Sequence, residues 1–120
     1  MLIQYLGQFL NFEKNYQHNL PSELALLTLY DPETGAPLAI MDATLITWMR
    51  TGAVTGTSIR HLAREDATSV GLVGCGVQGY YQLLYACTAR DVRRIALYDL
   101  SPAAISSLAA KLERSLPGVE

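Results

Sequence analysis

A glycine-spaced turn constrains the fold of this chain more than any other feature of its sequence. The apolar run from Val70 to Val73 leads directly into Gly74, Gly76 and Gly79, which form the pattern G-x-G-x-x-G, and a helix-like segment follows. A strand, a turn and a helix in this order are the context of a dinucleotide-binding fingerprint. Gly74 is expected to allow the tight turn, Gly76 to let a pyrophosphate approach the backbone, and Gly79 to let the helix pack closely on the strand. The N–H groups at the helix start would then hold the phosphates.

A second strand is predicted over residues 94–99, and it ends in an acid. Asp99 lies about 20 residues beyond Gly79, the spacing at which a carboxylate reaches the adenosine ribose hydroxyls of a dinucleotide. Such a carboxylate favours NAD over NADP, because it repels the 2′-phosphate of NADP. The alternative is an aspartate that only forms the turn before Leu100-Ser101-Pro102.

The Gly74-Cys75-Gly76 stretch is also compatible with a methyltransferase-like fold. The two-residue spacing before Gly79, and the absence of an acid in the strand from Val70 to Val73, argue against that fold. The glycine pattern and Asp99 together predict a site for a nicotinamide cofactor.

The composition is globular and excludes several classes of partner. Of the 120 residues, 50% are hydrophobic and 17% charged, which is enough for a real core. The net charge is −2 without a basic block, so neither nucleic acid nor a membrane is an expected partner. There is no apolar run of membrane-spanning length and no signal-peptide pattern. The two cysteines, Cys75 and Cys87, are not expected to form a disulfide, which predicts a protein in the reduced cytoplasm. No histidine pair has the spacing of metal ligands, so no metal is expected.

The part before the glycine turn, residues 1–64, is expected to be part of an α/β domain that ends in a long helix. Strands are predicted over Leu2–Asn11, Glu23–Tyr30 and Pro37–Met41, the last two as an antiparallel hairpin, and Asn11–Pro21 is predicted to be a loop. Asp42 is expected to cap a helix that runs to about Ala63. Its predicted apolar face consists of Leu45, Trp48, Met49, Gly52, Ala53, Gly56, Ile59 and Leu62. Gly52 and Gly56 mark a place where another backbone comes close.

Residues 65–120 are expected to form strand, helix, strand and helix, the first half of a Rossmann dinucleotide-binding domain. Ser101 is predicted to be the N-cap of the second helix, and Pro102 to lie in its first turn. The buried stripe of that helix is predicted to be Ile105, Leu108, Ala109, Leu112 and Leu116.

Several stretches resemble the ornithine cyclodeaminase/μ-crystallin family. They are Leu20-Pro21-Ser22, Tyr30-Asp31-Pro32-Glu33-Thr34-Gly35, residues 37–42, Ile46-Thr47, Arg50-Thr51-Gly52-Ala53, Leu62-Ala63-Arg64, and the fingerprint with Gln78 inside it. The resemblance extends from about Gly7 onward. It implies a Rossmann NAD(P)-binding domain paired with a second α/β domain for substrate binding and dimerisation. It also implies conversion of a small amino or imino acid: L-ornithine to L-proline with release of ammonia, or a related dehydrogenase or ketimine reductase reaction.

The resemblance also implies roles for single residues. Arg50 matches an arginine that reaches cofactor phosphate and substrate carboxylate, and its charged fork suits either anion. Arg50 lies between Met49 and Gly52, within the repeating pattern of apolar residues, which argues against the alternative that it is only a charged side chain on the helix surface. The full set of predicted cofactor contacts is Ser22, Arg50, Thr51, Gly74, Gly76, Val77, Gln78, Gly79 and Asp99.

Two departures from the family pattern stand out. A substrate-contacting lysine should fall near Gly7–Gln8, where Gln8 is the best match, and Lys14 lies in the predicted loop. The catalytic aspartate of the family belongs to a segment beyond Glu120. Half of a doubly wound sheet is expected to leave strand edges and helix faces uncovered, including the small-residue face of the long helix and the apolar stripe of the last one. The chain is therefore expected to be an internal fragment of a larger enzyme.

Two hypotheses of different class follow. The first is an NAD-dependent enzyme of amino-acid metabolism, a homodimer at full length. The second is a non-catalytic NAD-binding or dimerisation module, which Gln8 and the missing catalytic acid favour for the chain taken literally.

Overall fold

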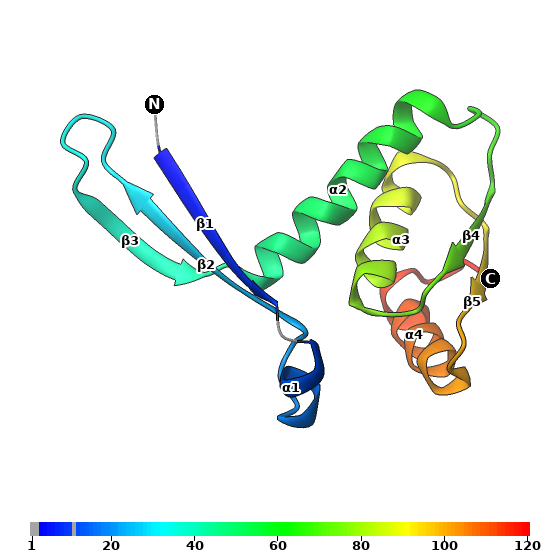
Figure 1. The fold of residues 1–120 in the computed structure, drawn as a ribbon. Coiled ribbons are helices and arrows are strands. Elements are labelled where there is room, and N and C mark those ends of the chain that lie inside the picture. Colours follow the sequence, from blue (N-terminus) through cyan, green and yellow to red (C-terminus); the bar gives the residue numbers. More distant parts are fainter. Residues whose placement is uncertain (1–2, 11) are drawn as a thin grey trace. The chain divides into compact units, whose positions relative to one another are not determined.

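The computed structural model describes residues 3–10 and 12–120. The chain forms two compact units, Met1–Thr47 and Trp48–Glu120, and each is described by itself (Figure 1). Helix α2 (Thr44–Leu62) begins in the first unit and continues in the second, where it packs on a later helix. The α/β fold class is confirmed.

The first unit contains a three-stranded antiparallel sheet in the order β1 (Ile3–Leu10), β2 (Glu23–Tyr30), β3 (Pro37–Asp42). The predicted hairpin of β2 and β3 is confirmed. Asp31 holds its turn, since Oδ1 of Asp31 accepts the N–H groups of Glu33 and Thr34, each over 2.8 Å. Leu2 and Asn11, the ends of the predicted first strand, lie outside the described residues.

Two predictions for this unit were wrong in detail. Residues Phe12–Gln17, predicted as loop, form a short helix α1; the polar Asn15 closes it, because its carbonyl accepts the Leu20 N–H over 2.8 Å. Asp42 ends β3, and α2 begins only at Thr44. The Asp42 carboxylate nevertheless accepts both the Thr44 N–H, over 3.1 Å, and the Thr44 hydroxyl, over 3.0 Å, so it orders the helix start.

The second unit is a parallel strand pair covered by two helices. Strands β4 (Ser69–Val73) and β5 (Arg94–Tyr98) alternate with α3 (Val77–Ala89) and α4 (Pro102–Ser115), in the predicted order. Both helices lie on the same side of the strands (Figure 1). The buried core is Cys75, Leu83, Leu108 and Leu112, against which Val70, Leu72, Ile95 and Leu97 pack.

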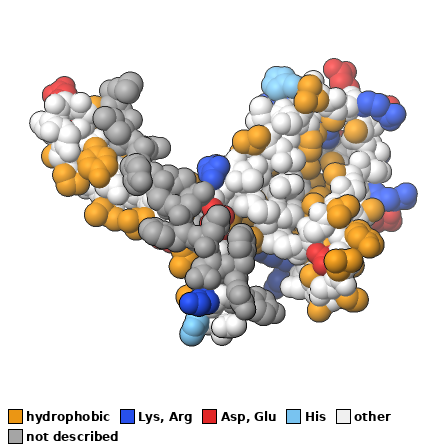
Figure 2. Space-filling model, viewed as in Figure 1, with side chains coloured by type: hydrophobic (Ala, Val, Ile, Leu, Met, Phe, Trp, Pro, Cys, Tyr) orange, Lys and Arg blue, Asp and Glu red, His pale blue; other side chains and the backbone are white. Residues whose placement is uncertain are grey.

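The apolar stripe of α4 is therefore covered within the chain, contrary to the expectation that it would stay exposed. Leu108 and Leu112 are buried, and Ile105 and Leu116 are half-buried against the same core. The side of the strand pair that faces away from the helices does remain open: Val73 is 82% exposed and Tyr98 58% exposed. Hydrophobic side chains are visible on the surface of both units (Figure 2).

Glu120 lies along the free edge of β5. Its N–H donates to the Arg93 carbonyl over 2.9 Å, and its carbonyl accepts the Ile95 N–H over 2.7 Å. This is the hydrogen-bond pattern of a parallel neighbour. Residue 120 thus sits beside β5 and not beside β4, which is the neighbour order of a doubly wound sheet.

The contact face of α2 is narrower than its apolar pattern predicted. Leu45, Met49 and Leu62 are exposed, whereas Gly52 and Gly56 are buried. The small-residue face has a partner after all: a Cβ added to Gly52 would lie 2.8 Å from the Tyr81 carbonyl oxygen of α3. The predicted close approach of another backbone is confirmed. No helix in the described part of the chain is long and apolar enough to cross a membrane.

Candidate dinucleotide site

The glycine turn joins β4 to α3 and has the conformation that its sequence predicts. Gly74 has φ +98, a value that L side chains rarely adopt, so the tight turn requires glycine here. The Gly74 N–H donates to the Tyr98 carbonyl at the end of β5, over 2.8 Å. The turn is thus anchored to the neighbouring strand.

Gly79 and Gly76 perform opposite steric functions. A Cβ on Gly79 would lie 2.5 Å from the Gly74 carbonyl oxygen and 2.8 Å from Cδ2 of Leu72, so only glycine lets α3 sit this close to β4. A Cβ on Gly76 would meet nothing within 4 Å. Gly76 therefore leaves open space directly in front of the helix start, where a pyrophosphate needs to approach the backbone.

The start of α3 offers hydrogen-bond donors. The first N–H groups of any helix, here those of Val77, Gln78 and Gly79, have no partner inside the helix. Gly76 is the N-cap residue and contributes no side-chain cap, and the first turn contains no acidic residue. Oε1 of Gln78 is buried and accepts no hydrogen bond within the described part of the chain. Open space, helix-start donors and an unused acceptor together fit a dinucleotide pyrophosphate with its adjoining hydroxyls.

Asp99 follows β5 directly and contacts the turn. Its Oδ2 accepts the Cys75 N–H over 2.7 Å, and its Oδ1 accepts the Ser101 N–H over 2.8 Å. These two bonds, that from Cys75 first, lower the pKa of the Asp99 carboxyl below its usual value. The bond from Ser101 shows that Asp99 forms the turn before Leu100-Ser101-Pro102, which was the alternative to a ribose contact. The bond from Cys75 also places the Asp99 carboxylate beside the glycine turn. Each carboxylate oxygen has a further lone pair for a ligand hydroxyl.

Cys75 lies inside the turn as a buried residue. Its pKa is raised, first by burial and then by the nearby negative charge of Asp99. Both Cys75 and Cys87 are free thiols. A thiol with a raised pKa is a poor nucleophile, so Cys75 acts here as a small buried side chain.

The other predicted contacts lie on separate elements. Arg50 and Thr51 are on α2 in the second unit; Thr51 is half-buried, whereas Arg50 is exposed. The exposure of Arg50 contradicts the inference, drawn from the apolar rhythm, that it is not a surface charge. Ser22 precedes β2 in the first unit and is half-buried. The structure thus brings the glycine turn and Asp99 into contact, while the role of Ser22 stays a prediction.

The substrate-lysine position gives less information. Gln8 pairs with Ala25 through its backbone in β1, and its side chain lies outside what the structure describes. Lys14 lies on α1. Among the described residues, no group of three His, Cys, Asp or Glu side chains is placed to hold a metal ion.

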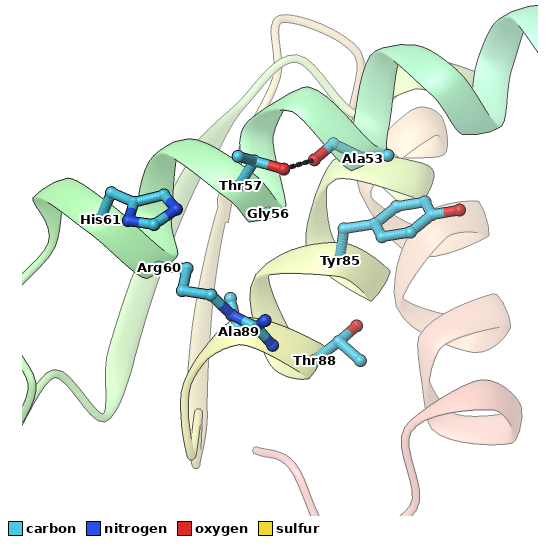
Figure 3. A pocket seen from close by; sticks show the side chains of 8 residues that line it. All are labelled: Ala53, Gly56, Thr57, Arg60, His61, Tyr85, Thr88 and Ala89. Carbon is cyan, nitrogen blue, oxygen red and sulfur yellow. Dashed lines mark hydrogen bonds between the residues drawn. The ribbon is translucent and has the colours of Figure 1, made fainter.

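A pocket of about 310 Å³ lies between the C-terminal halves of α2 and α3 (Figure 3). Its lining residues are Ala53, Gly56, Thr57, Arg60, His61, Tyr85, Thr88 and Ala89, and none of them belongs to the predicted site.

Sequence reasoning missed one residue that organises this unit. The guanidinium of Arg90, directly after α3, donates to three carbonyls at the end of α2, those of Arg60, Ala63 and Arg64, over 2.9–3.1 Å. A lone arginine after a predicted helix carries no sequence pattern that would reveal this contact.

Comparison with known proteins identifies the family. The sequence profile of the ornithine cyclodeaminase/mu-crystallin family matches residues 7–120. The chain belongs to this family. Alanine dehydrogenase from Archaeoglobus fulgidus is 43% identical to this chain over 86 residues, which are 72% of this chain and 27% of that protein.

Solved structures of the family have the same fold. The Thermococcus litoralis Δ1-pyrroline-2-carboxylate reductase, solved with NADH and L-proline, is 39% identical with a TM-score of 0.91, over 98% of this chain and 36% of that chain. An archaeal alanine dehydrogenase dimer with bound NAD is 33% identical with a TM-score of 0.89, over 99% of this chain and 37% of that one. The chain therefore spans little more than a third of the length of these relatives.

Proposed function

We propose that this chain forms the cofactor-binding part of an NAD-dependent enzyme that converts a small amino or imino acid. The observation that carries the proposal is the geometry of the glycine turn. The turn leaves free space beside Gly76, and Gly79 packs tightly on the Gly74 carbonyl. The Asp99 carboxylate accepts a hydrogen bond from the Cys75 N–H of the same turn. The relatives solved with NADH and L-proline, and with NAD, support the same cofactor and the same substrate class.

Each predicted residue has a role in this proposal. The N–H groups of Val77 and Gln78 bind the pyrophosphate at the helix start. Asp99 accepts the adenosine ribose hydroxyls and repels a 2′-phosphate, which makes NAD the preferred cofactor. Arg50, with Thr51 next to it, contributes its cation to a cofactor phosphate or a substrate carboxylate. Ser22 donates its hydroxyl to the dinucleotide. NAD, when bound, supplies hydride transfer.

We also propose that the protein acts as a homodimer, on the support of the dimeric alanine dehydrogenase. Sedimentation equilibrium of the purified chain tests this part separately. A concentration-dependent mass of two chains is expected, and a single-chain mass at all concentrations contradicts it.

The experiment for the function combines binding and turnover on the same preparation. Calorimetry should show one NAD bound per chain and weaker binding of NADP. The absorbance of NADH is then followed with Δ1-pyrroline-2-carboxylate, or with pyruvate and ammonia, as substrates that the relatives' names indicate. Oxidation of NADH with either substrate supports the enzyme. Binding of NAD without turnover supports the cofactor-binding part of the proposal alone, because the chain spans little more than a third of the relatives' length, and absence of NAD binding contradicts the proposal.

A further inference from the structure

We propose that Gly52, Gly56 and Arg90 are positioning residues for the cofactor. They fix the register in which α2 lies along α3, and so hold Arg50 and Thr51 level with the phosphate-binding turn. This inference rests on the proposed function, and concerns residues that have no place in the dinucleotide fingerprint.

The contact between the two helices is made backbone to backbone. A Cβ on Gly52 would lie 2.8 Å from the carbonyl oxygen of Tyr81 and 2.9 Å from its carbonyl carbon. A Cβ on Gly56 would lie 3.0 Å from Cβ and 3.1 Å from the carbonyl oxygen of Tyr85. Backbone atoms of a helix do not move aside as a flexible side chain does, so any larger residue at position 52 has to displace α2 itself.

The two contacts also define a register. The facing residues differ by 29 in number at both glycines, 52 with 81 and 56 with 85, so the helices run in the same direction along this contact. Continued one and two residues back, the same offset of 29 places Thr51 level with Tyr80 and Arg50 level with Gly79 along the helix axes. Arg50 stands about half a turn round α2 from Gly52, so its side chain is exposed and not covered by α3. The Trp48 ring, with its centroid 6.1 Å from that of Tyr81, belongs to the same end of the contact. The part of α2 from Trp48 to Gly52 thus lies near the first two turns of α3.

Arg90 secures the other end of the contact. Its Nε donates to the Arg64 carbonyl over 3.1 Å, and its Nη2 donates to the carbonyls of Arg60 and Ala63 over 3.0 and 2.9 Å. Arg60 belongs to the last turn of α2, whose carbonyls lack intrahelical partners, and Ala63 and Arg64 follow the helix directly. A planar guanidinium fixes several acceptors at once, so α2 resists sliding along α3. Arg90 acts at a distance, since the 13 residues of α3 place it about 20 Å from the helix start.

A double-mutant cycle on NAD binding tests the inference. Gly52→Ala is expected to weaken NAD binding by at least about tenfold when Arg50 is present, because a displacement of α2 by a fraction of an ångström misplaces the cation. In the Arg50→Met background, the same change should cost less than about twofold, because no cation remains to be misplaced. A Cβ on Gly56 has longer contacts with α3 than one on Gly52. Gly56→Ala should therefore also depend on Arg50, with a smaller loss of NAD affinity.

Gly71→Ala is the matched control, because a Cβ on this glycine meets nothing within 4 Å. It should leave both NAD affinity and melting temperature unchanged. If Gly52→Ala does not fold, Gly56→Ala and Arg90→Lys form the same cycle with Arg50→Met. Arg90→Lys keeps the positive charge but loses the planar guanidinium that donates to three carbonyls at once. The effect of this change on NAD affinity should therefore also depend on whether Arg50 is present.

The outcomes separate this inference from the proposed function. Additive losses, equal in both Arg50 backgrounds, would show that the glycines only stabilise the fold and would overturn the inference. The inference would also be overturned if the unaltered chain binds NAD and Arg50→Met binds it with the same affinity. A chain that binds no NAD would overturn the proposed function and this inference together.

Discussion

The carboxylate of Asp99 accepts the backbone N–H of Cys75 over 2.7 Å and so joins the end of β5 to the glycine turn. A second bond, from the Ser101 N–H to the other oxygen of Asp99, orients the start of α4. One side chain thus organises both the turn that would hold a pyrophosphate and the loop that would face the adenosine ribose. Hydrogen bonds within the chain therefore hold the turn in its conformation.

Protonation of Asp99 should weaken the fold. Folding lowers the pKa of this carboxyl, because the Cys75 and Ser101 N–H groups stabilise its charged form. The folded state therefore binds fewer protons than the unfolded state. The resulting stability is fully present above the unfolded pKa of about 3.9 and is lost as the pH falls through the lower, folded value.

Urea unfolding between pH 3 and 7 measures this effect. The unaltered chain should lose stability below about pH 4, and Asp99→Asn should show a shallower acid dependence over the same range. Asp66→Asn, a change of an exposed aspartate on the linker before β4, is the control. Identical acid profiles for Asp99→Asn and the unaltered chain would show that the two N–H bonds do not stabilise the charged form.

Replacement of Asp99 should also change cofactor preference. The double change Asp99→Ser with Leu100→Arg removes the negative charge that repels a 2′-phosphate and adds a cation at a fully accessible position, since Leu100 is 91% exposed. Calorimetric titration with NAD and NADP should show the ratio of the two affinities moving towards NADP. An unaltered chain that already binds NADP more tightly than NAD would refute the role of Asp99.

Gly79→Ala should destabilise the second unit. The added methyl group would lie 2.5 Å from the Gly74 carbonyl oxygen, so α3 must move off β4. Overpacking of this kind costs about 1–3 kcal/mol in the free energy of unfolding. Urea denaturation measures it, with Gly71→Ala as the control in open space. Equal stabilities of the two variants would mean that α3 does not depend on this close contact.

Arg90→Ala should lower the free energy of unfolding by about 1–2 kcal/mol, because three carbonyls in and directly after the last turn of α2 lose a charged donor, and Arg90 is half-buried. Arg93→Ala is the matched control. Arg93 is 73% exposed and paired with an exposed Asp91, a type of ion pair worth at most about 1 kcal/mol. Should the two variants unfold at the same urea concentration, the contact of Arg90 with α2 would be energetically unimportant.

The dinucleotide turn was predictable from sequence because its chemistry is local. Gly74 needs a positive φ, Gly79 needs a close approach to the strand just before it, and both requirements appear as glycines at fixed spacing. Asp99 was predictable for a similar reason, since its distance from Gly79 follows from the length of one helix and one strand. Its bond to the Cys75 N–H is a tertiary detail that spacing alone does not contain.

The errors fall where tertiary contacts override local pattern. The apolar rhythm of α2 predicted a broad buried face, yet the helix meets α3 through Gly52 and Gly56, so Leu45 and Met49 stay exposed. The exposure of Arg50 follows from the same narrow contact. Likewise α1 forms in a stretch whose asparagines predicted a loop, because Asn15 bonds to residues outside the helix, and Nδ2 of Asn15 donates to the Pro21 carbonyl over 2.9 Å.

The central claim, that the space in front of Gly76 holds the pyrophosphate of NAD, is tested most directly by Gly76→Ala. The new methyl group meets no protein atom within 4 Å, and φ of −81 suits alanine, so the chain should still fold, with a loss of about 1 kcal/mol because alanine is a poorer helix N-cap than glycine. Calorimetry should show NAD binding weakened by at least about tenfold, which corresponds to about 1.4 kcal/mol. Gly71→Ala should bind NAD as the unaltered chain does. Unchanged NAD affinity in Gly76→Ala would contradict the account, because the cofactor would then lie somewhere else.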